Sequence, residues 1–196
     1  NGVRMASFSK LNSAVLVGLH ARHVLVESFV DAQAVIHEID IVGLGDTAIK
    51  ESKKRVKSAI ASNNLGIPQG RIVINLAPGN LKKEGTLLDL PIAVSILACG
   101  DGVEREIPPG LFFFGELGLD GALRRVQGML PLLIALSQSK EPRTIVIPQE
   151  NAEEAKLVPD IDIRLASHLR EVLAYLNGNP LPRASTDDCP EPEAPV

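Results

Sequence analysis

The sequence predicts an α+β domain, and three observations carry this prediction. The 196 residues are 45% hydrophobic and 22% charged, which is the composition of a globular chain with a core, and the length fits one domain or one and a half. Segments with the two-residue period of strands alternate with segments that have the period of helices. The alternation follows no strict strand–helix–strand repeat, so a doubly wound parallel sheet is disfavoured.

The first half of the chain opens with strands. Clusters of β-forming residues predict three of them, at residues 13–19, 24–30 and 34–42. Asp46 or Thr47 then caps a helix that runs to about residue 64, because a short polar side chain accepts hydrogen bonds from the first-turn amides. A strand at 71–77 follows, and Pro78 ends it.

Shorter elements follow in the second half. Residues 87–98 predict a buried helix, with Pro91 tolerated in the first turn. Asp120 and Gly121 favour a tight hairpin turn, since this dipeptide readily takes a positive φ. The remaining expected elements are the two hairpin strands at 111–116 and 122–126, a helix at 129–137, a strand at 144–147, a short helix at 151–157, a strand at 161–165 and a closing helix at 167–176.

Composition also divides the chain. We expect residues 1–10 to be an amino-terminal extension or cloning remnant, since Met5 follows four residues that carry no apolar pattern. Residues 11–177 form the domain. Residues 178–196 are rich in proline and acidic side chains with little to bury, which is typical of an extended linker. A linker at the end of a chain predicts a domain cut from a longer protein.

Cysteine usage and apolar runs bear on location. Cys99 sits in an apolar run and Cys189 in the proline-rich tail, so a disulfide framework is not expected. No apolar run reaches the roughly 18 residues that a bilayer span requires. The sequence therefore predicts a cytoplasmic protein without a membrane partner.

Positive charge is concentrated between Asp46 and Lys83, where the local charge is +6 although the whole chain carries -4. On the expected helix the lysines fall on the arc opposite Ile49, Val56 and Ile60. Such a surface can bind phosphate without reading sequence, or remain a solvated face, or dock on another domain. The candidate nucleic-acid or partner-binding residues are Lys50, Lys53, Lys54, Lys57, Arg71, Lys82 and Lys83.

No cofactor or metal site is predicted within the chain. No glycine-rich G-x-x-x-x-G-K-[ST] loop occurs, so the chain has no phosphate loop for ATP. Gly43, Gly45 and Ala48 match a dinucleotide fingerprint in form, but Asp46 puts a carboxylate where the pyrophosphate would sit. His20 and His23 lie between two expected strands rather than on one helical face, which disfavours a zinc site and leaves their role open.

Four long segments, taken together and in order, resemble one family. They are GLGDTAIKESKKRVKSAI (43–60), INLAPGNLKKEGTLLDLPIAVSIL (74–97), FFGELGLDGALRRVQGMLP (113–131) and IPQENAEEAKLV (147–158). They closely resemble the amino-terminal domain of the bacterial magnesium-chelatase-like AAA+ proteins, the ComM or YifB family. The resemblance covers about residues 11–182 without large gaps.

The resemblance implies a Lon-protease-like fold, the type also seen in the second domain of small-subunit ribosomal protein five. It further implies that an AAA+ ATPase module, which binds ATP and Mg2+, follows the acidic tail. Full-length members of this family are understood as hexameric motors that move on branched DNA and extend strand exchange in recombination and natural transformation. The expected partners are therefore the chain's own ATPase module, other copies in a ring, and DNA.

The resemblance also locates the two positions at which Lon-type peptidases carry a serine and a lysine. The serine position falls on Leu87, after the Lys83–Thr86 string, and the lysine position falls on Leu130. Leucine offers neither a nucleophile nor a base, so the dyad is absent, and Thr86 keeps a hydroxyl without an activating lysine. We therefore expect a non-catalytic structural or binding module. The alternatives are a protein-docking platform and a residual Ser/Lys-type peptidase.

Overall fold

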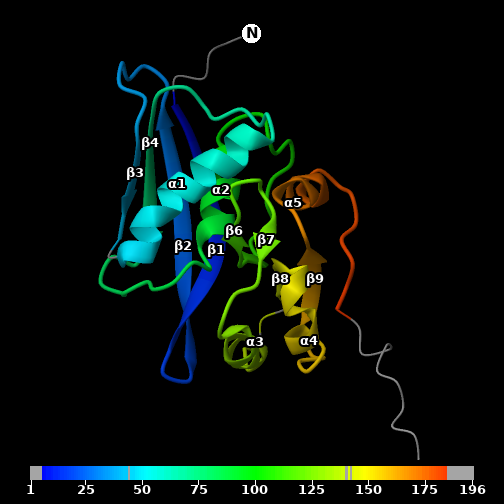
Figure 1. Cartoon of the computed structure of the whole chain (residues 1–196). Coiled ribbons are helices and arrows are strands. Elements are labelled where there is room, and N and C mark those ends of the chain that lie inside the picture. The colour runs from blue at the N-terminus through cyan, green and yellow to red at the C-terminus, as the bar shows by residue number, and fades with distance from the viewer. Residues whose placement is uncertain (1–5, 44, 140, 142, 185–196) are drawn as a thin grey trace, which may run out of the picture.

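The computed structural model describes residues 6–43, 45–139, 141 and 143–184, which form a twisted mixed sheet covered by helices (Figure 1). The strands are β1 (Ala6–Val17), β2 (His20–Asp31), β3 (Ile39–Val42), β4 (Arg71–Ala77), β5 (Leu111–Phe113), β6 (Glu116–Leu117), β7 (Leu123–Arg124), β8 (Thr144–Pro148) and β9 (Asp162–Ala166). The helices are α1 (Thr47–Ser62), α2 (Asp89–Ala98), α3 (Met129–Ser137), the 3-10 turn η1 (Gln149–Asn151), α4 (Ala152–Ala155) and α5 (Leu169–Leu176).

Seven strands make the main sheet, in the order β3-β4-β2-β1-β5-β8-β9. The pairs β1–β2 and β2–β4 are antiparallel, and the other four pairs are parallel. The short strands β6 and β7 form a separate hairpin. This mixed sheet agrees with the predicted α+β class.

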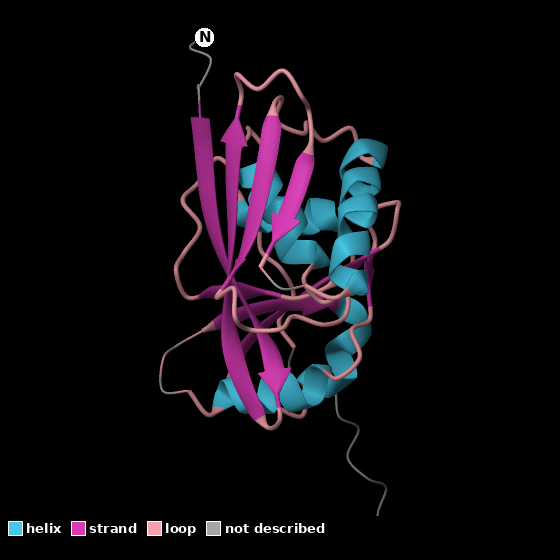
Figure 2. Ribbon diagram, turned by 90° about the vertical axis from the view of Figure 1, so that its left-hand side faces the viewer, coloured by secondary structure: helices cyan, strands magenta, loops and turns pink. Residues whose placement is uncertain are grey.

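One core lies between α1, α2 and the β3-β4-β2-β1 half of the sheet. β4 alternates buried Ile72, Ile74 and Leu76 with more exposed neighbours, so that only one face of the strand packs on the helices. α2 is buried from Asp89 to Leu97 and sits beneath α1. Figure 2 shows helices beside the upper part of the long strands and a further helix across the lower end of the long hairpin. A second core joins the carboxy-terminal part of β1, at Ala14 and Leu16, to β5, β8, β9, α3 and α4.

Several predicted elements are confirmed. α1 begins after Asp46, whose Oδ1 accepts from the amide of Ile49 at 2.9 Å, as a capping residue should. β4 and α3 have the bounds that the sequence predicts. No helix in the described ranges is long and apolar enough to cross a membrane.

Three predictions of elements were wrong in extent or partner. β1 begins at Ala6, within the residues assigned to the extension, because its first half pairs with β2. The third strand is short because residues 32–38 turn through a loop that leaves Val35 92% exposed. The 111–116 segment divides: β5 is fully buried and joins the main sheet between β1 and β8, and only Glu116, in β6, enters the expected hairpin with β7.

The described chain past residue 177 packs along β9. Gly178 takes a positive φ of 113° after α5, and the chain then returns along the outer edge of β9. The amide of Leu165 donates to Pro182 O, and the amide of Ala184 donates to Ile163 O. Most of the expected linker, residues 185–196, lies outside the described residues.

Candidate nucleic-acid interface

The lysines of α1 lie together on its outer side. Ile49, Val56 and Ile60 pack into the core, but the four lysines do not lie opposite this stripe as expected: at about 100° per residue they follow one flank of the helix, with Lys53 next to the buried stripe. Lys50, Lys54 and Lys57 are exposed and Lys53 is half-buried. Within the described part of the chain none of the four forms an ion pair. A rise of about 1.5 Å per residue spaces them over roughly 10 Å of helix.

Cations elsewhere are mostly paired or scattered. Eight arginines and lysines lie within 4.0 Å of a carboxylate oxygen, namely Arg55, Arg71, Lys82, Arg125, Arg143, Lys156, Arg164 and Arg183. The exposed cations without such a partner in the described ranges stand on separate elements, namely Lys10, Arg22, Arg105, Arg124 and Arg170. The α1 lysines are therefore the main concentration of unneutralised positive charge.

Arg71 and Lys82 do not extend this surface. Arg71 faces away from the helices, since Ile72 beside it is buried on the helix side, and its guanidinium lies 2.9 Å from Asp40 Oδ2. Lys82 is exposed, but its ammonium lies 2.5 Å from Glu84 Oε1. This hydrogen bond to Glu84 and the charge of the carboxylate raise the pKa of Lys82.

Lys83 corrects the sequence prediction most clearly, because its side chain is fully buried. Its ammonium donates to Gly43 O at 2.6 Å and to Pro78 O. Burial lowers the pKa of Lys83. Lys83 therefore ties the loop after β4 to the turn before α1 and is not available to a phosphate at the surface.

The glycine-rich turn before α1 is shaped by close packing. Gly43 has a φ of 112°, and a Cβ there would lie 2.3 Å from Leu76 O, so no larger residue fits without a shift. Asp46 uses one carboxylate oxygen for the Ile49 amide and the other for the Gly85 amide, at 3.1 Å. The turn thus holds a carboxylate where a dinucleotide site would hold phosphate.

The two positions matched to the peptidase dyad carry leucines that serve packing. Leu87 is half-buried between the two cores, and Leu130 packs on the second core. A hollow of about 360 Å³ lies beside Leu87, between the β1–β2 hairpin and the start of α3, with Lys82 at its rim. The Thr86 hydroxyl donates to Glu116 Oε2 at 2.6 Å, so its partner is a carboxylate and not a lysine.

His20 and His23 both lie in β2. The Nε2 atom of His23 is 2.8 Å from Asn12 Oδ1, and its ring meets Phe112 edge-on at 5.7 Å between centroids. Burial, and then the charge of Arg143, lower the pKa of His23 below 6.5. Over the described ranges, no group of three or more potential ligands is arranged to hold a metal ion.

Sequence reasoning missed a buried polar cluster beneath α1. Asp89 is fully buried and accepts from Ser52 Oγ at 2.5 Å and from Arg55 Nε at 2.6 Å. Its Oδ2 also accepts from the amide of Leu117 at 3.2 Å. The hydrogen bond to Asp89 raises the pKa of Arg55. A single carboxylate in an otherwise apolar helix was the signal that could have revealed it.

Fold and site together define an α+β domain whose main surface feature is a basic helix. A family model described as subunit ChlI of magnesium chelatase matches residues 26–151. The chain belongs to this magnesium-chelatase-like family, and it is also similar to ComM and YifB proteins.

Three curated relatives illustrate the match. Competence protein ComM of Haemophilus influenzae is 41% identical over 138 residues, which is 70% of this chain and 27% of ComM. Uncharacterized protein YifB of Salmonella typhimurium is 34% identical over 189 residues, or 96% of this chain and 37% of that protein. Uncharacterized protein YifB of Escherichia coli is 35% identical over 172 residues, which is 88% of this chain and 33% of that protein. The chain thus spans between about a quarter and two fifths of these relatives.

Proposed function

We propose that this chain is a non-catalytic, Lon-protease-like domain of a ComM-like AAA+ ATPase and that α1 gives the whole protein a DNA-binding surface. Family membership supports the assignment, and the much greater length of the relatives leaves room for further modules. The mixed sheet supports the fold part of the proposal. The leucines at both positions matched to the peptidase dyad support the part that calls the domain non-catalytic.

In this proposal the chemistry belongs to the rest of the protein. The ATPase module binds ATP and Mg2+, assembles as a hexamer in the cytoplasm, and moves on branched DNA during recombination and natural transformation. The present domain adds contact with DNA and helps to assemble the ring. A residual peptidase role is disfavoured because the Thr86 hydroxyl bonds to Glu116 and the Lys83 amine to backbone carbonyls.

The observation that carries DNA contact is the set of four lysines on one side of α1, none of which forms an ion pair with another described residue. An ion pair within the protein would have to break before its cation could bind phosphate, whereas these lysines are free to do so. Their contacts would go to the backbone, so binding should be insensitive to sequence and sensitive to salt.

Fluorescence anisotropy with a labelled duplex tests the proposal. Three or four phosphate contacts predict that affinity falls by roughly 40- to 150-fold between 50 and 200 mM salt. Changing Lys50, Lys54 and Lys57 to Glu should abolish binding.

A matched control keeps the same change of net charge but moves it elsewhere. Arg71, Lys156 and Arg183 lie outside α1 and each pairs with a carboxylate, and these three residues are changed to Glu together. This control should bind DNA nearly as the parent chain does. Equal losses in the two triple variants would show that net charge, and not the α1 surface, governs binding.

A further inference from the structure

A second surface, apart from α1, lies along the first half of β1. On one side β1 pairs with β2 from Ala6 onward. On the other side, strand pairing starts only at Asn12, opposite Phe112 of β5. In the described chain, residues 7–11 therefore present a strand edge of about 16 Å without a neighbouring strand.

The other edges of the sheet are short or covered. β3 ends the sheet on one side with only four residues, which limits pairing with another chain. β9 ends it on the other side, and residues 181–184 run along that edge. The open stretch of β1 is the long edge that the described fold leaves available.

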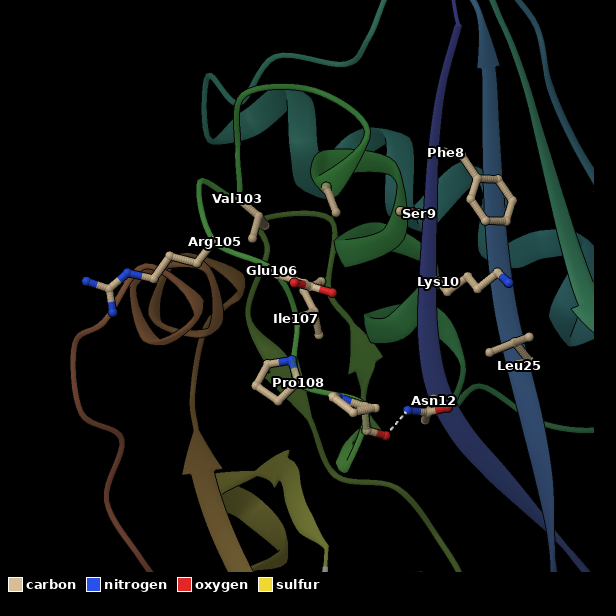
Figure 3. Close-up of a pocket in the computed structure, with 12 residues that line it drawn as sticks. Phe8, Ser9, Lys10, Asn12, Leu25, Val103, Arg105, Glu106, Ile107 and Pro108 are labelled. Atoms are coloured by element: carbon tan, nitrogen blue, oxygen red, sulfur yellow. Dashed lines mark hydrogen bonds between the residues drawn. The ribbon is translucent and has the colours of Figure 1, made fainter.

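The segment 103–109 stands opposite this edge and cannot close it. Pro108 and Pro109 have no amide hydrogen to donate to a ladder. No backbone hydrogen bond between described residues joins 7–11 to this segment, and the link is the Asn12 side chain, which donates to Pro109 O at 2.6 Å. A hollow of about 580 Å³ lies between the two walls (Figure 3).

Side chains around the hollow divide into an apolar floor and a charged rim. Ala98, Val103 and Ile107 are among its apolar lining residues, and Lys10, Arg105 and Glu106 are its charged ones. Phe8 and Lys10 lie on the outer face of β1, and Figure 3 shows them pointing to the opposite side from Ser9, whose hydroxyl donates to Ser95 O at 2.7 Å. An added strand would thus alternate side chains between the floor and the face that carries Phe8 and Lys10.

We propose that this groove binds an extended segment of another polypeptide as an added β-strand, with an acidic side chain beside Lys10. Unpaired backbone groups along an edge recognise a backbone, and the second wall admits a single extended chain rather than the edge of a folded sheet. Lys10 stands opposite Glu27 of β2, whose carboxylate accepts from the Asn75 amide, while its own ammonium rests 5.3 Å from the Phe8 ring and forms no ion pair in the described ranges. A carboxylate on the added strand can therefore pair with Lys10 across the open edge.

Five-residue peptides with blocked ends test the proposal by NMR on the isotope-labelled chain. Val-Glu-Val-Tyr-Val places glutamate beside Lys10 and tyrosine beside Phe8 if the added strand is antiparallel, and Val-Tyr-Val-Glu-Val does so if it is parallel. At millimolar concentration one of the two should shift the amide signals of residues 7–11. Replacing its glutamate with lysine should weaken binding about two- to fivefold.

Three protein variants and one peptide variant separate this mode from non-specific contact. Lys10→Glu should reverse the preference, so that the lysine peptide binds better. Ile107→Arg fills the hollow and should abolish peptide binding, whereas Arg183→Glu, at the β9 edge of the sheet, should leave peptide binding unchanged. Methylation of the alternate peptide amides that face β1 removes their hydrogen-bond donors and should also abolish peptide binding. Absence of shifts in residues 7–11 with both peptides, or equal binding of the methylated peptide, would overturn the proposal.

Discussion

Replacing Asp89 with alanine is expected to destabilise the domain strongly, although the residue touches no surface. The carboxylate accepts hydrogen bonds from Ser52, from two nitrogens of Arg55 and from the amide of Leu117. Alanine removes every acceptor at once and leaves the guanidinium beneath α1 with only the exposed carboxylate of Glu51, 3.9 Å away, as a counter-charge.

The size of the effect follows from burial. Breaking a buried ion pair by removing one partner costs about 3–5 kcal/mol. The Arg55 side chain retains 19% exposure, so water relieves part of this cost and we expect the lower end, about 3 kcal/mol. For a domain of this size that corresponds to a fall in Tm of roughly 6–12 °C. Urea unfolding followed by circular dichroism measures the free energy directly.

A double variant checks the reasoning. Combining Asp89→Leu with Arg55→Met leaves neither charge buried, so the double variant should be clearly more stable than Asp89→Ala. A loss below about 1 kcal/mol in Asp89→Ala would refute the argument, because it would mean that the pair is not buried as a unit.

Two further predictions concern the turn before α1. Burial lowers the pKa of Lys83, so the unfolded chain holds the proton of this lysine more readily than the folded chain does. The stability of the parent chain relative to Lys83→Met should therefore rise with pH between that lowered pKa and the ordinary value of about 10.5. Urea unfolding of both chains at several alkaline pH values measures this difference, and a difference that does not change with pH would contradict the prediction. Gly43→Ala places a Cβ 2.3 Å from Leu76 O at a positive φ and should cost about 2 kcal/mol in urea unfolding. Gly79→Ala has no neighbour within 4 Å and should change stability by less than about 0.5 kcal/mol, so equal losses would be inconsistent with the close approach at Gly43.

Elements with strong local signals could be predicted from the sequence. α1 has a capping aspartate and an apolar stripe with the helical period, and the structure confirms both. The placement of β5 could not be predicted in the same way. Its run of apolar residues fits a hairpin arm as well as a buried parallel strand, and only pairing with β1 and β8, distant in sequence, decides between them.

The candidate site was predictable in part for a similar reason. Charge counting and the helical period located the lysines of α1, but neither could show which cations elsewhere find partners. Lys82 and Lys83 are adjacent in sequence and have opposite environments, since one pairs with Glu84 at the surface and the other is buried against two carbonyls. Asp89 and Arg55 are 34 residues apart, so their ion pair depends on the packing of α2 under α1.

The most direct test of the central claim is a lysine-reactivity footprint. The chain is acetylated briefly with and without duplex DNA at low salt, and each modified lysine is quantified by mass spectrometry. Contact through α1 predicts protection of Lys50, Lys54 and Lys57, with Lys10 and Lys82 as internal references that keep their reactivity. Unchanged reactivity along α1 under conditions where the DNA is bound, or protection confined to the reference lysines, would contradict the proposed role of this helix.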